Sequence, residues 1–190
     1  MEIIRKLRVS FGYLSSILLI VTARPVSGVY FTLGAIVAVM GEALRVWASC
    51  YIIKLDRLTT DGPYRATRNP LYLGSFLLMS GLIIISMNPF IAAICYSLFA
   101  VIYPITIKAE SKELEKKFGD YYAEYRHSTP AFFPTPKSVK RAFTEITSFF
   151  SSIGNRFANF LKNREYNGII ALVIVLALLY YKFRRSSRVK

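Results

Sequence analysis

Hydrophobic residues run in long unbroken blocks along this chain rather than alternating with polar ones. Four such blocks precede residue 110, at residues 11–23, 29–53, 71–87 and 89–107. Lipid admits only helices or closed barrels, and barrel strands would alternate, so these blocks predict transmembrane helices. Asn88-Pro89 predicts a tight turn between the third and fourth helices. We therefore expect an all-α, polytopic integral membrane protein with four core transmembrane helices.

The composition supports the same class. Hydrophobic residues make up 54% of the 190 residues and charged residues 19%, which is more apolar surface than a soluble domain of this size can bury. An aromatic content of 15% excludes a disordered chain. The two cysteines and the single histidine are too few for a zinc or iron–sulfur site, so we expect no metal.

Basic residues gather on one side of the predicted helices. Arg5, Lys6 and Arg8 precede the first block, the loop at residues 54–70 holds four more basic residues, and four lysines lie at residues 108–117, directly after the fourth block. The two loops on the other side hold only Arg24. By the positive-inside rule, the N-terminus and the main loop are expected in the cytoplasm.

The predicted transmembrane core comprises residues 1–135, and the region that follows it is strongly basic. Between Lys137 and Lys190 there are eleven basic residues against Glu145 and Glu165, which is +9 of the formal net charge of +14. Apolar residues recur there at helical spacing: Val139, Phe143, Ile146, Phe150, Ile153, Phe157 and Phe160. This pattern predicts a basic amphipathic helix within residues 136–166, lying in the interface against anionic lipid headgroups rather than binding nucleic acid. A partner helix or a dimer seam is the alternative.

The last apolar run, residues 169–181, belongs to a C-terminal segment, residues 167–190, that ends in a basic tail. Its length lies between that of a spanning and of an interfacial helix. A fifth transmembrane helix is therefore possible in this segment.

Two segments carry candidate chemistry. Residues 58–74 join the second and third helices and contain Asp61-Gly62-Pro63, which predicts a turn, and Asn69-Pro70, which predicts a capped helix start. In the second segment, Glu110 lies on the same helical arc as Leu114 and Phe118. A carboxylate on an apolar arc needs a partner, so Glu110 is the candidate acid, whereas Glu113 and Glu115 are expected on a solvated face.

Together the segments carry a family resemblance. Gly62-Pro63-Tyr64-x-x-x-Arg68-Asn69-Pro70-x-Tyr72-x-Gly74, followed by Glu110-x-x-x-Leu114-x-x-x-Phe118-Gly119-x-x-Tyr122-x-x-Tyr125, resembles the isoprenylcysteine carboxyl methyltransferases. The related phospholipid methyltransferases share this pattern, and the resemblance covers about residues 30–134. It implies an integral-membrane enzyme that transfers a methyl group from S-adenosylmethionine to a lipidic or prenylated acceptor.

The resemblance also implies the residues that bind this cofactor, and we add Arg68 as the expected partner of the cofactor's carboxylate. The full set is Asp56, Arg57, Leu58, Thr59, Tyr64, Arg68, Asn69, Pro70, Leu71, Tyr72 and Glu110. No catalytic residue is assigned. Thr106 stands where the better-studied relatives have a substrate-binding arginine, so Lys108 is the substrate-facing candidate. The alternatives are a non-enzymatic scaffold that binds anionic lipid or a partner protein, and an NADPH-dependent membrane reductase.

Overall fold

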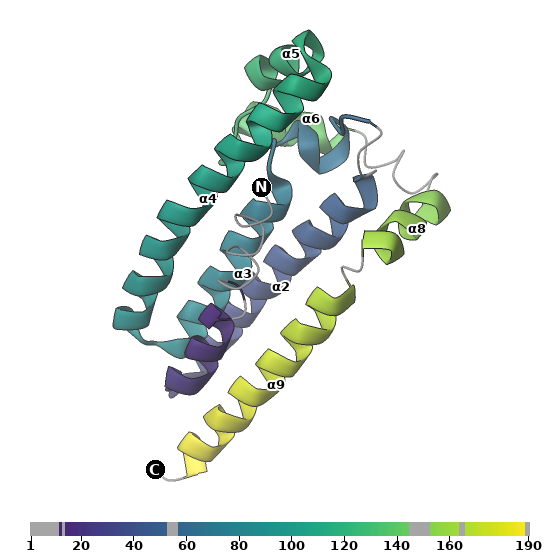
Figure 1. Ribbon diagram of the computed structural model, residues 1–190. Helices are drawn as coiled ribbons and strands as arrows, with labels where there is room; N and C mark the ends of the chain where they lie inside the picture. The colour runs from purple at the N-terminus through teal and green to yellow at the C-terminus, as the bar shows by residue number, and fades with distance from the viewer. Residues whose placement is uncertain (1–11, 13, 53–56, 145–152, 164–165, 189–190) are drawn as a thin grey trace. The chain divides into compact units, whose positions relative to one another are not determined.

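The computed structural model describes residues 12, 14–52, 57–144, 153–163 and 166–188 (Figure 1). Within these ranges every regular element is helical, which confirms the expected all-α class. The elements are α2 (Gly28–Tyr51), η1 (Gly62–Arg65), α3 (Pro70–Ser86), α4 (Pro89–Phe118), α5 (Asp120–Ser128), α6 (Pro136–Phe143), α8 (Ile153–Asn163) and α9 (Tyr166–Arg188). Residues 14–22, in the first predicted block, are helical as well.

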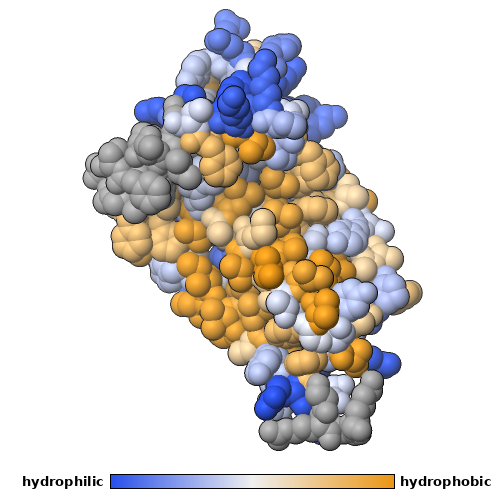
Figure 2. All heavy atoms as spheres, turned by 180° about the vertical axis from the view of Figure 1, so that it is seen from behind, coloured by the Kyte–Doolittle hydropathy of each residue, from blue (hydrophilic) through white to orange (hydrophobic). Residues whose placement is uncertain are grey.

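Three of the described helices are long and apolar enough to cross a membrane: Gly28–Tyr51, Pro89–Phe118 and Tyr166–Ser186. Pro70–Ser86 is a shorter apolar helix of 17 residues, at the lower limit of spanning lengths. On the face drawn in Figure 2, hydrophobic residues gather over a broad area and most strongly hydrophilic residues lie apart from it. The chain is therefore a polytopic membrane protein. The last apolar run lies within α9, a helix of 23 residues.

The contacts divide the chain into two units. The first consists of Met1–Glu42, Phe76–Ala109 and Gly168–Lys190. In this unit α2 and α3 approach closely at Gly34 and Gly81, where a Cβ on Gly34 would lie 2.5 Å from the carbonyl oxygen of Gly81. Met87 and Asn88 form the expected turn before α4, and Asn88 Oδ1 accepts from the amide of Ile91.

Helix α9 runs antiparallel to α2 within this first unit. Near its start, Gly168 lies against the carboxylate of Glu42, and near its end Phe183 stacks on Phe31 with ring centroids 5.7 Å apart. Lys182 Nζ donates to the carbonyl of Ile20 at 2.7 Å, at the end of the helical residues 14–22. A lysine at this position satisfies helix-terminal carbonyls that have no intrahelical donor.

The second unit, Ala43–Ser75 with Glu110–Asn167, holds both candidate segments. It contains the last turns of α2, η1, the first turn of α3, the end of α4, and α5, α6 and α8. Two apolar clusters lie in it, one around Tyr51 and Tyr64 and the other around Leu58, Tyr122 and Tyr125.

In the basic region, where one amphipathic helix is expected, the structure describes two helical segments. Helix α6 begins with a capping box at Thr135 and ends at Phe143, and α8 begins at Ile153. The described part of the region thus forms two helices, and the predicted face residues Ile146 and Phe150 lie outside the described residues.

Candidate functional site

The two candidate segments meet at Tyr72 and Glu110. The Tyr72 hydroxyl donates to Glu110 Oε1 at 2.5 Å, across 38 residues of sequence. Tyr72 lies in the first turn of α3, which begins at Pro70, and it is 6% exposed. Glu110 lies on the last part of α4 and is partly buried. The carboxylate on the apolar arc therefore has the partner that its position requires.

Arg68 and Asn69 are fixed by α5 and by the segment that follows it. Arg68 donates through its backbone amide to Pro130 at 2.9 Å and through Nη1 to the Tyr122 hydroxyl at 3.3 Å. Asn69 lies at the position before Pro70, and its side-chain Nδ2 donates to the carbonyl of Ala131 at 2.8 Å. Arg68 Nε is buried and has no hydrogen-bond partner among the described residues. It is a buried guanidinium donor whose hydrogen-bonding capacity is not used by the described residues.

Tyr64 belongs to the first apolar cluster and is 8% exposed. It lies on η1, which Gly62 enters with a φ of +57°. Two independent reasons favour glycine at this position. A positive φ disfavours any L side chain, and a Cβ atom on residue 62 would overlap the Tyr51 ring. Leu71 packs against the same cluster, so the structure brings Tyr64 and Leu71 together.

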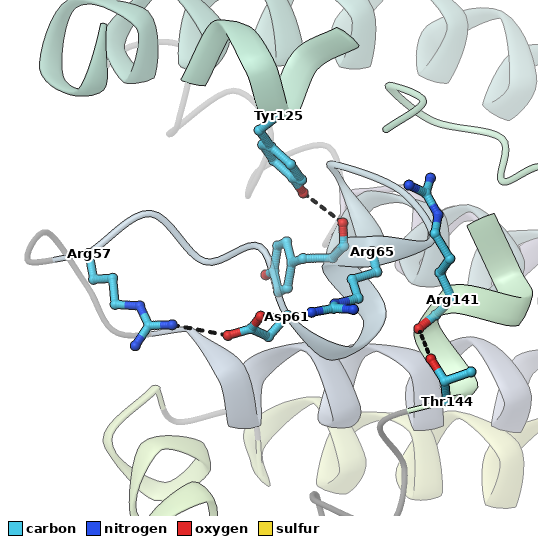
Figure 3. Close-up of polar contacts among 7 residues, drawn as sticks. Arg57, Asp61, Arg65, Tyr125, Arg141 and Thr144 are labelled. Carbon is cyan, nitrogen blue, oxygen red and sulfur yellow. Dashed lines mark hydrogen bonds and ion pairs between the residues drawn. The ribbon is translucent and has the colours of Figure 1, made fainter. Parts of the chain in front are cut away.

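Tyr125 joins α5 to the turn that carries Tyr64. Its hydroxyl donates to the backbone carbonyl of Tyr64 at 2.7 Å, in the contact drawn in Figure 3. Burial raises the pKa of Tyr125 well above the ordinary value of a phenol, against the smaller lowering effect of Arg68. Tyr125 therefore remains a hydrogen-bond donor at any physiological pH.

The remaining predicted site residues lie in different environments. Leu58 is buried in the second cluster, and Thr59 Oγ1 donates to the carbonyl of Tyr51 at 3.3 Å. Arg57 is exposed and pairs with Asp61 at 3.0 Å, which also accepts an ion pair from Arg65 (Figure 3). Asp56 lies outside the described residues, and Lys108 is exposed on α4.

One turn further along α3 lies a polar contact that was not predicted from the sequence. Arg45 Nη1 donates to Ser75 Oγ at 2.7 Å, which joins α2 to α3. Two signals were available in the sequence: Ser75 follows Tyr72 by three residues, and Arg45 is a charged residue inside the apolar block at residues 29–53. Among the described residues, no three histidine, cysteine, aspartate or glutamate side chains come together where they could hold a metal ion.

Tyr72 and Glu110 both lie in a stretch of the chain that matches a known protein family. The family model of phospholipid methyltransferases matches residues 15–121, which is more than half of the chain. The chain belongs to this family of integral-membrane methyltransferases.

Two relatives are similar to the chain. The nickel-cobalt-cadmium resistance protein NccN of Alcaligenes xylosoxydans xylosoxydans is 35% identical over 111 residues, which cover 57% of this chain and 52% of NccN. The cobalt-zinc-cadmium resistance protein CzcN of Cupriavidus metallidurans is 36% identical over 136 residues, which cover 70% of this chain and 62% of CzcN. The chain thus spans between half and two thirds of the length of these relatives. No solved structure matches it.

Proposed function

We propose that this protein transfers a methyl group from S-adenosylmethionine to a lipidic or membrane-embedded acceptor. The observation that carries the proposal is the hydrogen bond between Tyr72 and Glu110, because it joins the two motif segments of a phospholipid methyltransferase family member into one cluster. Both residues lie in the same unit of the structure as Tyr64, Arg68 and Asn69.

The candidate side chains in this unit fit the chemistry of that cofactor. Glu110 offers carboxylate oxygens that accept from ribose hydroxyls or an ammonium group. The buried Nε of Arg68, which lacks a partner among the described residues, offers a donor to the carboxylate end. Tyr64 and Tyr72 offer aromatic rings to a purine or to a sulfonium cation. The donor set thus has an acidic, a basic and an aromatic part.

In this reaction the protein's main task is to align the reactants rather than to transfer protons. When bound, the sulfonium group supplies an activated methyl that is transferred by in-line displacement. The residues of this chain then have two tasks, which are to fix one reactant and to exclude water. Tyr72 and Glu110 orient each other through their hydrogen bond, and Tyr125 fixes the turn of Tyr64. A carboxylate acceptor needs no general base, whereas an amine acceptor has to lose a proton.

The acceptor is expected to come from the membrane. An enzyme made of apolar helices meets lipidic molecules laterally, and the exposed Lys108 is our candidate for contact with an anionic part of the acceptor. We further propose that the basic residues around α6 and α8 bind anionic lipid headgroups.

The test is calorimetric titration of the purified protein with S-adenosylmethionine. Glu110→Gln keeps an oxygen that can accept from Tyr72 but removes the charge, so we expect its affinity for the cofactor to be about tenfold weaker. Glu113→Gln is the matched control, because Glu113 is exposed three residues further along the same helix. Wild-type protein without saturable binding overturns the proposal, and NADPH binding in its place would indicate the reductase.

If Glu110→Gln binds as tightly as wild type, the site assignment is wrong even though the cofactor is right. The acceptor class is then identified by thin-layer chromatography of lipid extracts incubated with the protein and with cofactor labelled in its methyl group. Label in a lipid band that depends on wild-type protein supports a lipidic acceptor. If wild type binds the cofactor but no lipid band is labelled, the lipidic acceptor is wrong.

A further inference from the structure

Helix α8 closes the end of α2, although it lies beyond the residues that match the family. Asn163 Nδ2 donates to the carbonyl of Ser49 at 2.9 Å and to that of Ile52 at 3.3 Å. Asn159 Nδ2, one turn earlier, donates to the carbonyl of Cys50 at 3.3 Å. The last carbonyls of a helix have no intrahelical donor, so these two amides cap α2 from outside.

The same helix packs on the aromatic residues beside the candidate site. Phe160 is 7% exposed and belongs to the cluster of Tyr51 and Tyr64. The guanidinium carbon of Arg156 lies 3.9 Å from the centroid of the Tyr51 ring, within the range of a cation–π contact. Three turns of one helix therefore converge on the end of α2 and on Tyr51.

Tyr51 in turn supports the turn that carries Tyr64. Gly62 lies so close to the Tyr51 ring that a Cβ would overlap it, and Thr59 Oγ1 donates to the Tyr51 carbonyl. Helix α8 thus contacts Tyr51, and Tyr51 contacts η1, the turn on which Tyr64 lies. An aromatic side chain that stacks on a ligand has to be held in place by the packing around it, because small misplacements weaken binding.

We propose that α8 is a positioning element for the candidate site, in which Phe160 and Arg156 fix Tyr51 and the two asparagines fix the end of α2. The place of Tyr64 then depends on a helix about a hundred residues later in the chain. The part of this proposal that concerns cofactor affinity rests on the proposed function. The part that concerns the packing of Tyr51 and Tyr64 does not.

The experiment uses the full-length protein in lipid nanodiscs and compares Phe160→Ala with Leu161→Ala. Leu161 is the control, because it is an apolar residue of the same helix that is 47% exposed. Trp47, the one tryptophan of the chain, packs against the Tyr51 cluster, so its emission reports on that cluster. All measurements are made well below the melting temperature of each variant.

For Phe160→Ala we expect a red shift of the Trp47 emission and about tenfold weaker binding of S-adenosylmethionine. Leu161→Ala should match wild type in both, and Phe160→Leu should restore most of the affinity. Wild-type emission and affinity in Phe160→Ala, or equal losses in Phe160→Ala and Leu161→Ala, would overturn the proposal.

Two further outcomes keep the test decisive. If wild-type protein binds no cofactor, the proposed function fails, and the Trp47 emission alone decides the role of α8. If Phe160→Ala does not fold, Asn163→Ala takes its place, since it removes two hydrogen bonds and no apolar packing. We then expect binding that is about threefold weaker, and unchanged binding would overturn the proposal.

Discussion

The hydrogen bond between Tyr72 and Glu110 should hold the candidate site together before any ligand binds. A double-mutant cycle of Tyr72→Phe and Glu110→Ala measures this, since Phe keeps the ring and Ala removes the acceptor. The 2.5 Å distance is that of a charge-assisted bond, and bonds to charged groups are worth about 1.5–3 kcal/mol. Tyr72 is buried but Glu110 is only partly so, which places the expected coupling near the lower limit, at about 1.5 kcal/mol.

The assay is reversible unfolding in mixed detergent micelles, followed by the emission of Trp47. Each single variant should lose about 1.5–2 kcal/mol, and the double variant should lose little more than either. Glu113→Ala is the control and should lie within about 0.5 kcal/mol of wild type, because Glu113 is exposed. Losses that simply add up in the double variant would show that the two residues do not interact, and the structural basis of the proposed site would be refuted.

Two further predictions concern the turn that carries Tyr64. Gly62→Ala should destabilise the protein by about 1–2 kcal/mol through its positive φ and by about 1–3 kcal/mol more through overlap with Tyr51. Gly119→Ala, with a φ of +54° and open space around it, should cost only the first part, so equal shifts in melting temperature would contradict the contact. Tyr125→Phe should lower stability by about 1 kcal/mol, because it leaves the Tyr64 carbonyl without this donor. The pKa of Tyr125 is raised on folding, so the stability it contributes is present below the unfolded value of about 10 and is lost as the pH rises further. The melting temperatures of wild type and Tyr125→Phe should therefore differ by a constant amount from about pH 6 to pH 9 and converge only above about pH 10. Convergence at neutral pH would contradict the buried phenol.

Local rules predicted the parts of the site that lie within one helix or one turn. Pro70 marks the start of α3 because a proline fits the first turn, and the arc of Glu110, Leu114 and Phe118 follows from helical spacing. The structure places Leu114 and Phe118 against a buried cluster and Glu110 against Tyr72, as that arc requires. The meeting of the two segments came from the family resemblance, since periodicity in one helix says nothing about its neighbour.

The sequence could not locate the end of α6 within the basic region. Helical spacing from Val139 to Phe160 identifies which residues are apolar, but it does not show whether the backbone between them is one helix. The structure ends α6 at Phe143, and Phe160 is buried against Tyr51 and Tyr64 rather than left for lipid. The contacts of Asn159 and Asn163 were equally hidden, because a side chain that donates to a distant backbone carbonyl leaves no periodic signal.

The family match ends at residue 121, yet many partners of the motif loop come later in the chain. Tyr125 donates to the Tyr64 carbonyl, Ser138 Oγ donates to the Ala66 carbonyl at 2.8 Å, and Ala131 accepts from Asn69. Buried carbonyls need such donors, because an unpaired backbone group in an apolar environment is costly. The motif residues alone therefore do not define the loop. Donors from α5 and α6 also fix its shape, and we propose that α8 contributes through Tyr51.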